Sequence, residues 1–235
     1  MVNTPYERII KMYSIAIDGP SGSGKSSVAK AVSARLGFLY VDTGAIYRTV
    51  GVFAKRNNID PHDEETLGAN LDRVDIKIKW IDGTQHVFLS DEDVSEEIRL
   101  PEMSMYASAV SALGKVRAFL LQMQRDFAKT NNVIMDGRDI GTVVLPDADV
   151  KIFMFASAEA RAQRRYKELV EKGKDVTYED VLSDMVERDK NDSSRALAPC
   201  KPAEDAIMLD NSEMSLEVNI EKVLEIINEK INVAL

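Results

Sequence analysis

Cysteine is almost absent from this 235-residue chain, in which Cys200 stands alone. A single cysteine excludes a disulfide within the chain and a metal site built from several thiolates, and it suits a reducing compartment. No apolar run approaches the roughly 18 residues that a membrane-spanning helix requires. The first twelve residues lack the apolar segment of a secretory signal. We therefore expect a cytoplasmic protein without a membrane partner.

Basic residues are in the minority, with 30 Lys and Arg against 39 Asp and Glu and a formal net charge of −9. Such a chain repels a phosphate backbone at long range, so we expect no nucleic-acid partner. The remaining composition, 45% apolar and 29% charged, is that of an ordinary globular protein. The length fits one domain with an insertion, or two small domains.

Short apolar runs alternate with helical patterns through most of the chain. Residues 13–18 and 38–42 are typical of buried strands, and 25–36 and 44–57 carry helical spacing. This order predicts an α/β fold with a parallel sheet flanked by helices. We expect further strands at 132–136, 149–156 and 206–210, and helices at 101–112, 114–129, 158–171, 177–190 and 215–231.

One region interrupts this order. Residues 74–80 alternate apolar and polar side chains, Asp82-Gly83-Thr84 is a turn signal, and a second alternating run follows at 85–90. Two such runs around a turn predict a β-hairpin. We therefore interpret residues 63–100 as a small subdomain inserted into the α/β fold.

A complete phosphate-loop pattern, G-x-x-x-x-G-K-[ST], occupies residues 19–26. Its glycines let successive N–H groups turn toward phosphate oxygens, and the next helix adds its positive N-terminal end. Lys25 would reach the β- and γ-phosphates, and the Ser26 hydroxyl would ligate Mg²⁺. The pattern fits a kinase, a GTPase switch or a motor, although the guanine-reading N-K-x-D motif is absent. The expected ATP site comprises Gly19, Pro20, Ser21, Gly22, Ser23, Gly24, Lys25, Ser26 and Ser27.

Arginines are placed where a second anion would bind. An enzyme that joins two polyanions needs fixed cations, and the arginine fork grips phosphate bidentately. Arg138 follows the end of a buried strand, which is where open α/β sheets bind ligands. Asp136, at that strand end, would hold Mg²⁺ through water or cap a loop. The other candidates are Arg48, Arg188, Arg195 and the group Arg161, Arg164 and Arg165, which would serve equally as a solvated helix face.

Four segments together resemble the bacterial cytidylate (CMP) kinases, a family of P-loop nucleoside monophosphate kinases. They are IAIDGPSGSGKSS, DTGAIYR, MDGRDIGTVVLPDADVKIF and RDKNDSSRALAP, and the resemblance runs from about 13 to 232. It implies an N-terminal extension or tag remnant at 1–12 and one kinase domain over 13–235. The implied core is 13–42, 130–157 and 200–235, with an NMP-binding region at about 43–115 that holds the hairpin, and a short helical lid at about 158–190.

The resemblance also implies roles for individual residues. Thr43, Arg48 and Arg138 would bind the acceptor 5′-phosphate, and Ser108, Arg117 and Asp139 would read cytosine. Arg188 and Asp192 would hold the ribose hydroxyls and Arg195 would act near the phosphates; their spacing of i, i+4, i+7 predicts one shared helix face. Arg161, Arg164 and Arg165 would sit on a lid over ATP, and would act with Lys25 and Arg138 in catalysis.

The implied activity is ATP-dependent phosphorylation of CMP and dCMP to CDP and dCDP, in pyrimidine nucleotide metabolism, with Mg²⁺ and in a monomer. One alternative is a kinase for another nucleoside monophosphate or small metabolite. Another is a regulatory protein that holds ATP without transferring phosphate. Two separate anion sites, at Lys25 and at Arg48 with Arg138, disfavour the second alternative.

Overall fold

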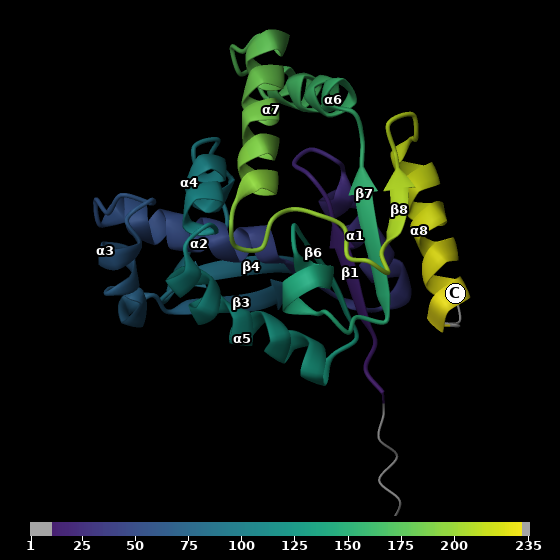
Figure 1. Cartoon of the computed structure of the whole chain (residues 1–235), viewed down its shortest axis with the longest axis horizontal. Helices are drawn as coiled ribbons and strands as arrows, with labels where there is room; N and C mark the ends of the chain where they lie inside the picture. The colour runs from purple at the N-terminus through teal and green to yellow at the C-terminus, as the bar shows by residue number, and fades with distance from the viewer. Residues whose placement is uncertain (1–10, 232–235) are drawn as a thin grey trace, which may run out of the picture.

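The computed structural model describes residues 11–231 and is built around a five-stranded parallel sheet (Figure 1). Residues 1–10 of the expected N-terminal extension and the last four residues of the expected core lie outside the described residues. The predicted parallel α/β sheet is confirmed. Its strands, in spatial order, are β2 (Leu39–Asp42), β6 (Val133–Gly137), β1 (Ser14–Asp18), β7 (Val150–Phe155) and β8 (Ile207–Asp210).

Alternation along the strands divides the core into two halves. Ile15 and Ile17 of β1 face α1 (Lys25–Leu36) and α8 (Leu216–Ile231), whereas Ala16 faces the cluster formed with α2 (Thr43–Arg56) and α5 (Gly114–Thr130). All three side chains are fully buried. Near-continuous apolar strands are what a sheet covered on both faces requires.

The inserted region forms a second sheet, in which β3 (Ile76–Ile81), β4 (Thr84–Leu89) and β5 (Glu92–Asp93) run antiparallel. The predicted hairpin is confirmed, and the short third strand was not expected. Asp82 and Gly83 have φ values of 49° and 71°, as a two-residue type I′ turn requires. In Figure 1, β3 and β4 lie between α2 and α5. The region also contains α3 (Glu64–Gly68) and 3₁₀ turns at Leu71–Arg73 and Glu97–Arg99, and α4 (Met103–Val110) follows it.

Two helices rise above the carboxyl end of β7 (Figure 1). They are α6 (Ala158–Glu171) and α7 (Tyr178–Ser194), and they pack on each other through Ala162, Val181 and Met185. This cluster is separate from both halves of the main core. The apolar cluster of α6 and α7 is therefore not continuous with the core that packs α1 and α2 against the sheet.

Two predicted helices differ from the structure by two or more residues at an end. The helix predicted at 177–190 continues to Ser194, and the helix predicted at 101–112 spans only Met103–Val110. Residues 140–144 form one π-helical turn, which was not among the expected elements. Its first two N–H groups, of Ile140 and Gly141, donate to the carboxylate of Asp18 at 2.8 and 2.7 Å. Such a cap depends on a residue more than a hundred positions away, so no local pattern reveals it.

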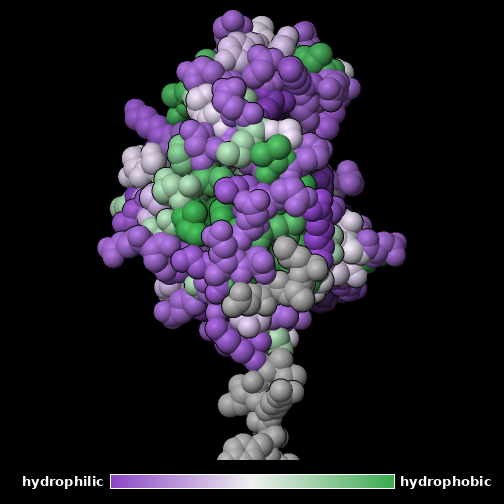
Figure 2. All heavy atoms as spheres, turned by 90° about the vertical axis from the view of Figure 1, so that its right-hand side faces the viewer, coloured by the Kyte–Doolittle hydropathy of each residue, from purple (hydrophilic) through white to green (hydrophobic). Residues whose placement is uncertain are grey.

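The side of the molecule formed by β8 and α8 faces the viewer in Figure 2, where hydrophobic side chains lie among polar ones. Exposed apolar residues of these two elements are Met208, Leu216 and Val218. β8 is an edge strand of the main sheet. Among the helices of the described part of the chain, none has the length and apolar character needed to cross a bilayer.

Candidate active site

The phosphate loop connects β1 to α1, as the sequence predicts. Gly19, Gly22 and Gly24 adopt φ values of 151°, 73° and 83°, a region that L side chains rarely enter. A Cβ atom on Gly19 would lie 1.9 Å from the carbonyl oxygen of Met154 in β7. The loop therefore requires glycine both for its dihedral angles and for its close approach to the neighbouring strand.

Lys25 and Ser26 open α1 beside the end of β6. The Lys25 ammonium donates to the carbonyl of Pro20 at 3.2 Å, and burial together with the charge of Arg138 lowers its pKa to about 7. The Ser26 hydroxyl donates to Oδ2 of Asp136 at 2.6 Å, and the Tyr40 hydroxyl donates to Oδ1 at 3.0 Å. Burial raises the pKa of Asp136. A hydroxyl and a carboxylate in contact are hard oxygen ligands that fit Mg²⁺ with phosphate and water.

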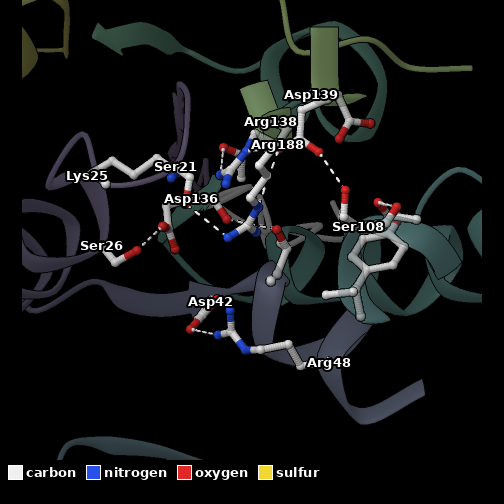
Figure 3. Close-up of a pocket in the computed structure, with 18 of the residues that line it drawn as sticks. Ser21, Lys25, Ser26, Asp42, Arg48, Ser108, Asp136, Arg138, Asp139 and Arg188 are labelled. Carbon is white, nitrogen blue, oxygen red and sulfur yellow. Dashed lines mark hydrogen bonds and ion pairs between the residues drawn. The ribbon is translucent and has the colours of Figure 1, made fainter. Parts of the chain in front are cut away.

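A cleft of about 780 Å³, including its open mouth, lies beyond the carboxyl ends of β1, β2 and β6. Figure 3 shows Lys25 and Ser26 on one side of it and Ser108 on the other. The structure gathers here every residue expected to bind the acceptor: Thr43, Arg48, Ser108, Arg117, Arg138, Asp139, Arg188, Asp192 and Arg195. They come from α2, α4, α5, α7 and the segments that follow β6 and α7.

The start of α2 forms one wall of this cleft. Asp42 caps the helix, because its Oδ1 accepts from Ala45 N–H at 2.9 Å, and its Oδ2 pairs with the Arg48 guanidinium at 2.9 Å (Figure 3). The Nε of Arg48 is buried and has no hydrogen-bond partner in residues 11–231. The Thr43 hydroxyl donates to the carbonyl of Asp136 at 2.7 Å, which ties α2 to β6.

Arg138 and Arg188 lie at the centre of the cleft. Arg138 Nε pairs with Asp192 at 2.9 Å, and Arg188 donates to the Ser21 hydroxyl of the phosphate loop at 2.9 Å. Burial, and then the charge of Arg138, lowers the pKa of Arg188 to about 10. Buried guanidinium groups that repel each other gain most from a bound anion, so this part of the cleft is suited to phosphate.

The far end of the cleft contains a buried ion pair between Arg117 and Asp139. Arg195 lies 3.9 Å from the second carboxylate oxygen of Asp139 and donates to the Ser111 hydroxyl at 2.9 Å. The Arg117 guanidinium sits 5.8 Å from the centre of the Tyr47 ring. A carboxylate held by two arginines beside an aromatic ring offers a hydrogen-bond acceptor next to a flat apolar surface.

A second cleft begins at the same phosphate loop and continues between α6 and the start of α8. Arg164 and Arg165 line it with Met214 and Leu216, which offer apolar surface. Lys25 and Ser26 line both clefts. The two clefts therefore meet at the residues expected to hold a triphosphate. The residues that line the second cleft are Gly22, Gly24, Lys25, Ser26, Ser27, Arg164, Arg165, Glu168, Asn211, Met214, Leu216 and Asn219.

Two sequence expectations need correction or refinement. The predicted shared helix face of Arg188, Asp192 and Arg195 was wrong, because α7 ends at Ser194 and Arg195 is extended, with φ −64° and ψ 143°. Arg161 lines neither cleft. It donates to the Ser21 carbonyl at 2.9 Å and pairs with Asp189 at 2.6 Å, so it holds α6 and α7 to the phosphate loop.

Several lining or supporting residues were missed by sequence reasoning. Asp42, Tyr47 and Ser111 line the acceptor cleft, and Asp18 supports the π turn, with burial raising its pKa to about 7. A signal existed for Asp42 only, since an aspartate before a helical pattern is a preferred N-cap. The others depend on contacts between distant segments.

Comparison with known proteins agrees with the motifs. The sequence profile of the family described as cytidylate kinase matches residues 15–229. A cytidylate kinase of Caldicellulosiruptor bescii is 52% identical over 217 residues, which is 92% of this chain and 96% of that protein. A cytidylate kinase of Klebsiella pneumoniae is 47% identical over 220 residues, covering 94% and 97%. The chain in which two clefts meet at Lys25 therefore belongs to the cytidylate kinase family.

Proposed function

We propose that this enzyme transfers the γ-phosphoryl group of ATP to the 5′-phosphate of CMP or dCMP, giving ADP with CDP or dCDP. It is a phosphotransferase that uses a phosphate group as acceptor. The observation that carries the substrate proposal is the meeting of two clefts at Lys25 and Ser26. One cleft offers backbone N–H groups and apolar surface to ATP, and the other offers arginines and a buried carboxylate to the acceptor.

The transfer is an in-line displacement. An oxygen of the acceptor phosphate attacks the γ-phosphorus, and the bond to the β,γ-bridging oxygen breaks, leaving ADP. The attacking oxygen is already anionic, so no strong general base is needed. Catalysis then consists of positioning and charge neutralisation. Lys25 neutralises the donor phosphates, and Arg48 and Arg138 neutralise the acceptor phosphate.

Magnesium would be held by the Ser26 hydroxyl and, through water, by Asp136. When bound, the ion neutralises charge on the donor phosphates. Asp136 is pre-oriented for this because Ser26 and Tyr40 both donate to it. Its raised pKa means that the charged carboxylate is disfavoured in the free protein. A cation beside it would remove that penalty.

Cytosine would be recognised at the far end of the acceptor cleft. Asp139 would accept a hydrogen bond from the exocyclic N4 amine, whereas uracil presents a carbonyl oxygen at that position and would be repelled. The ion pair with Arg117 holds the Asp139 carboxylate in place, and the Arg117 charge opposes the burial that raises the pKa of Asp139. Ser108 donates to Asp192 at 3.2 Å, which links a base-reading residue to a ribose-binding residue of the proposal.

The helices α6 and α7 would close over ATP. They are joined to the phosphate loop at Ser21, through Arg161 to its carbonyl and Arg188 to its hydroxyl. Closure excludes water, which would otherwise accept the phosphoryl group in place of the substrate. Arg164 and Arg165 would then approach the donor phosphates from the lid side of the second cleft.

A substrate panel with Mg·ATP tests the proposal. We expect kcat/KM for CMP or dCMP to exceed that for UMP and AMP by tenfold or more, about 1.4 kcal/mol in transition-state binding. A tenfold advantage of UMP or AMP would instead indicate a kinase for another monophosphate. ADP released equally fast without an acceptor would indicate an ATPase or a regulatory nucleotide binder.

A further inference from the structure

The inserted sheet docks along the free edge of the main sheet. β2 is an edge strand, so the N–H and C=O groups on its outer side lack a strand partner. Trp80 of β3 donates from its indole N–H to the carbonyl of Tyr40 at 3.1 Å. Gln85 of β4 is the cross-strand partner of Trp80. The two side chains therefore reach the β2 edge together.

Gln85 makes both of its contacts to the backbone of one residue, Asp42. Its Oε1 accepts from the Asp42 N–H at 2.9 Å, and its Nε2 donates to the Asp42 carbonyl at 3.3 Å. The carboxamide thus takes the place that a neighbouring strand would have. Its second bond is the longer one, so the first is the stronger constraint on Asp42.

Gln85 is a polar exception on its strand. The inward positions of β4 are Gln85, Val87 and Leu89, and Gln85 is only 9% exposed. A buried carboxamide is costly unless its donor and acceptor are both satisfied. Here they are satisfied by Asp42 alone, so Gln85 specifies where the Asp42 backbone lies.

Asp42 in turn sets the direction of Arg48. One carboxylate oxygen caps α2 and the other pairs with the Arg48 guanidinium at 2.9 Å. Within the described part of the chain, Asp42 is the hydrogen-bond partner of Arg48. A shift of the Asp42 peptide would therefore move the Arg48 guanidinium relative to the cleft.

We propose that Gln85 is a positioning residue for acceptor binding. The inserted sheet holds the Asp42 backbone through Gln85, and Asp42 aims Arg48 at the acceptor phosphate. Gln85 does not line the cleft and acts only through Asp42. This role rests on the proposed function, in which Arg48 binds that phosphate.

The direct test is Gln85→Met, which keeps an unbranched side chain of similar size and removes both hydrogen bonds. We expect KM for CMP to rise about tenfold, because a buried peptide loses its partners, with KM for ATP and kcat close to those of the unmodified enzyme. Val87→Ala is the matched control. It weakens the same face of the same strand without touching Asp42, so its melting temperature should fall while KM for CMP stays unchanged. If Gln85→Met also lowers only the melting temperature, the proposal is wrong.

Gln85→Glu serves if the methionine variant does not fold. Glutamate keeps the acceptor for the Asp42 N–H and loses the donor to the Asp42 carbonyl. We expect a KM for CMP between those of the unmodified enzyme and Gln85→Met, or simply above that of the unmodified enzyme if Gln85→Met is insoluble. An unchanged KM for CMP in soluble Gln85→Glu overturns the proposal.

A double-mutant cycle with Arg48→Ala separates this role from the proposed function. We expect Arg48→Ala to raise KM for CMP, and Gln85→Met to add nothing further in that background. If Gln85→Met raises KM by the same factor in both backgrounds, Gln85 acts by another route and only the positioning role fails. If Arg48→Ala alone leaves KM for CMP unchanged, the assigned function of Arg48 fails first.

Discussion

The phosphate loop and the acceptor cleft both suit phosphate, but they are built differently. The loop is one continuous segment, in which three glycines set the backbone conformation and the backbone N–H groups would bind phosphate. The cleft is made of side chains from five separated segments, and its arginines are held by carboxylates: Arg48 by Asp42, Arg138 by Asp192 and Arg117 by Asp139.

This difference has an energetic consequence. A loop of backbone N–H groups is neutral and stays in place without ligand, whereas buried arginines repel each other and would turn away without their carboxylates. The carboxylates pre-orient the guanidinium groups and weaken their charge. The cleft therefore attracts phosphate less strongly than unpaired arginines would, but its arginines have a fixed geometry. Fixed geometry matters most at a site that must position both the base and the phosphate.

Lys25→Met breaks the donor side and has the largest expected effect. The variant keeps the volume and loses the charge that neutralises the donor phosphates, so we expect kcat to fall about 10²- to 10³-fold. KM for CMP should change little, because the acceptor cleft keeps its arginines. Steady-state kinetics with both substrates varied checks this. A loss confined to KM for CMP would mean that Lys25 serves the acceptor.

Asp139→Asn breaks the base-reading end of the acceptor cleft. The amide keeps the size but loses the charge that pairs with Arg117. We therefore expect kcat/KM for CMP to fall, with a loss of about 2–4 kcal/mol of transition-state stabilisation. The same variant should gain relative activity on UMP, since its amide can donate to a uracil carbonyl. An unaffected rate on CMP would remove Asp139 from the site.

ATP binding should be pH-dependent through Lys25. Because the pKa of Lys25 is lowered to about 7, its side chain is partly neutral at pH 7 in the free protein. Bound phosphates favour the charged form of this side chain. Binding should therefore take up protons near pH 7, and ATP affinity should weaken as the pH rises above 7. Isothermal titration calorimetry in buffers of different ionisation enthalpy measures this uptake. Uptake that persists in Lys25→Met would have another source, such as Asp18, whose pKa is also about 7.

The smallest effect is expected at a surface ion pair. Arg56 pairs with Glu92 at 2.7 Å and also with Glu97, outside both clefts. Exposed pairs contribute little to stability, so Arg56→Ala should lower the melting temperature by no more than a few degrees and leave KM for CMP unchanged. A large kinetic effect would show that the inserted region influences the acceptor cleft by more routes than Gln85.

The same contrast explains what could be predicted from sequence. The glycine-rich loop between β1 and α1, the parallel sheet and the hairpin all follow from local spacing and are confirmed as structural elements, whereas ATP binding by the loop stays a prediction. The gathering of the acceptor residues was predictable only through the resemblance to cytidylate kinases, because spacing alone does not bring Arg48 of α2 beside Arg138. Their individual roles stay predictions.

The missed features share one physical cause. Asp18 acts by capping a turn that starts at Ile140, and Gln85 acts on the backbone of Asp42. Arg195 was placed on a helix because nothing between Asp192 and Pro199 signals that α7 ends at Ser194. Asp18 and Gln85 act on partners distant in sequence, and tertiary contacts override local pattern in such cases.

The most direct test is a crystal structure with CMP, Mg²⁺ and a non-hydrolysable ATP analogue bound together. We expect Arg48 and Arg138 to contact the CMP phosphate, Lys25 to lie between the two nucleotides, and Asp139 to accept from the cytosine amine. If Arg48 and Arg138 instead face solvent and the two phosphates are held apart, the result contradicts the account.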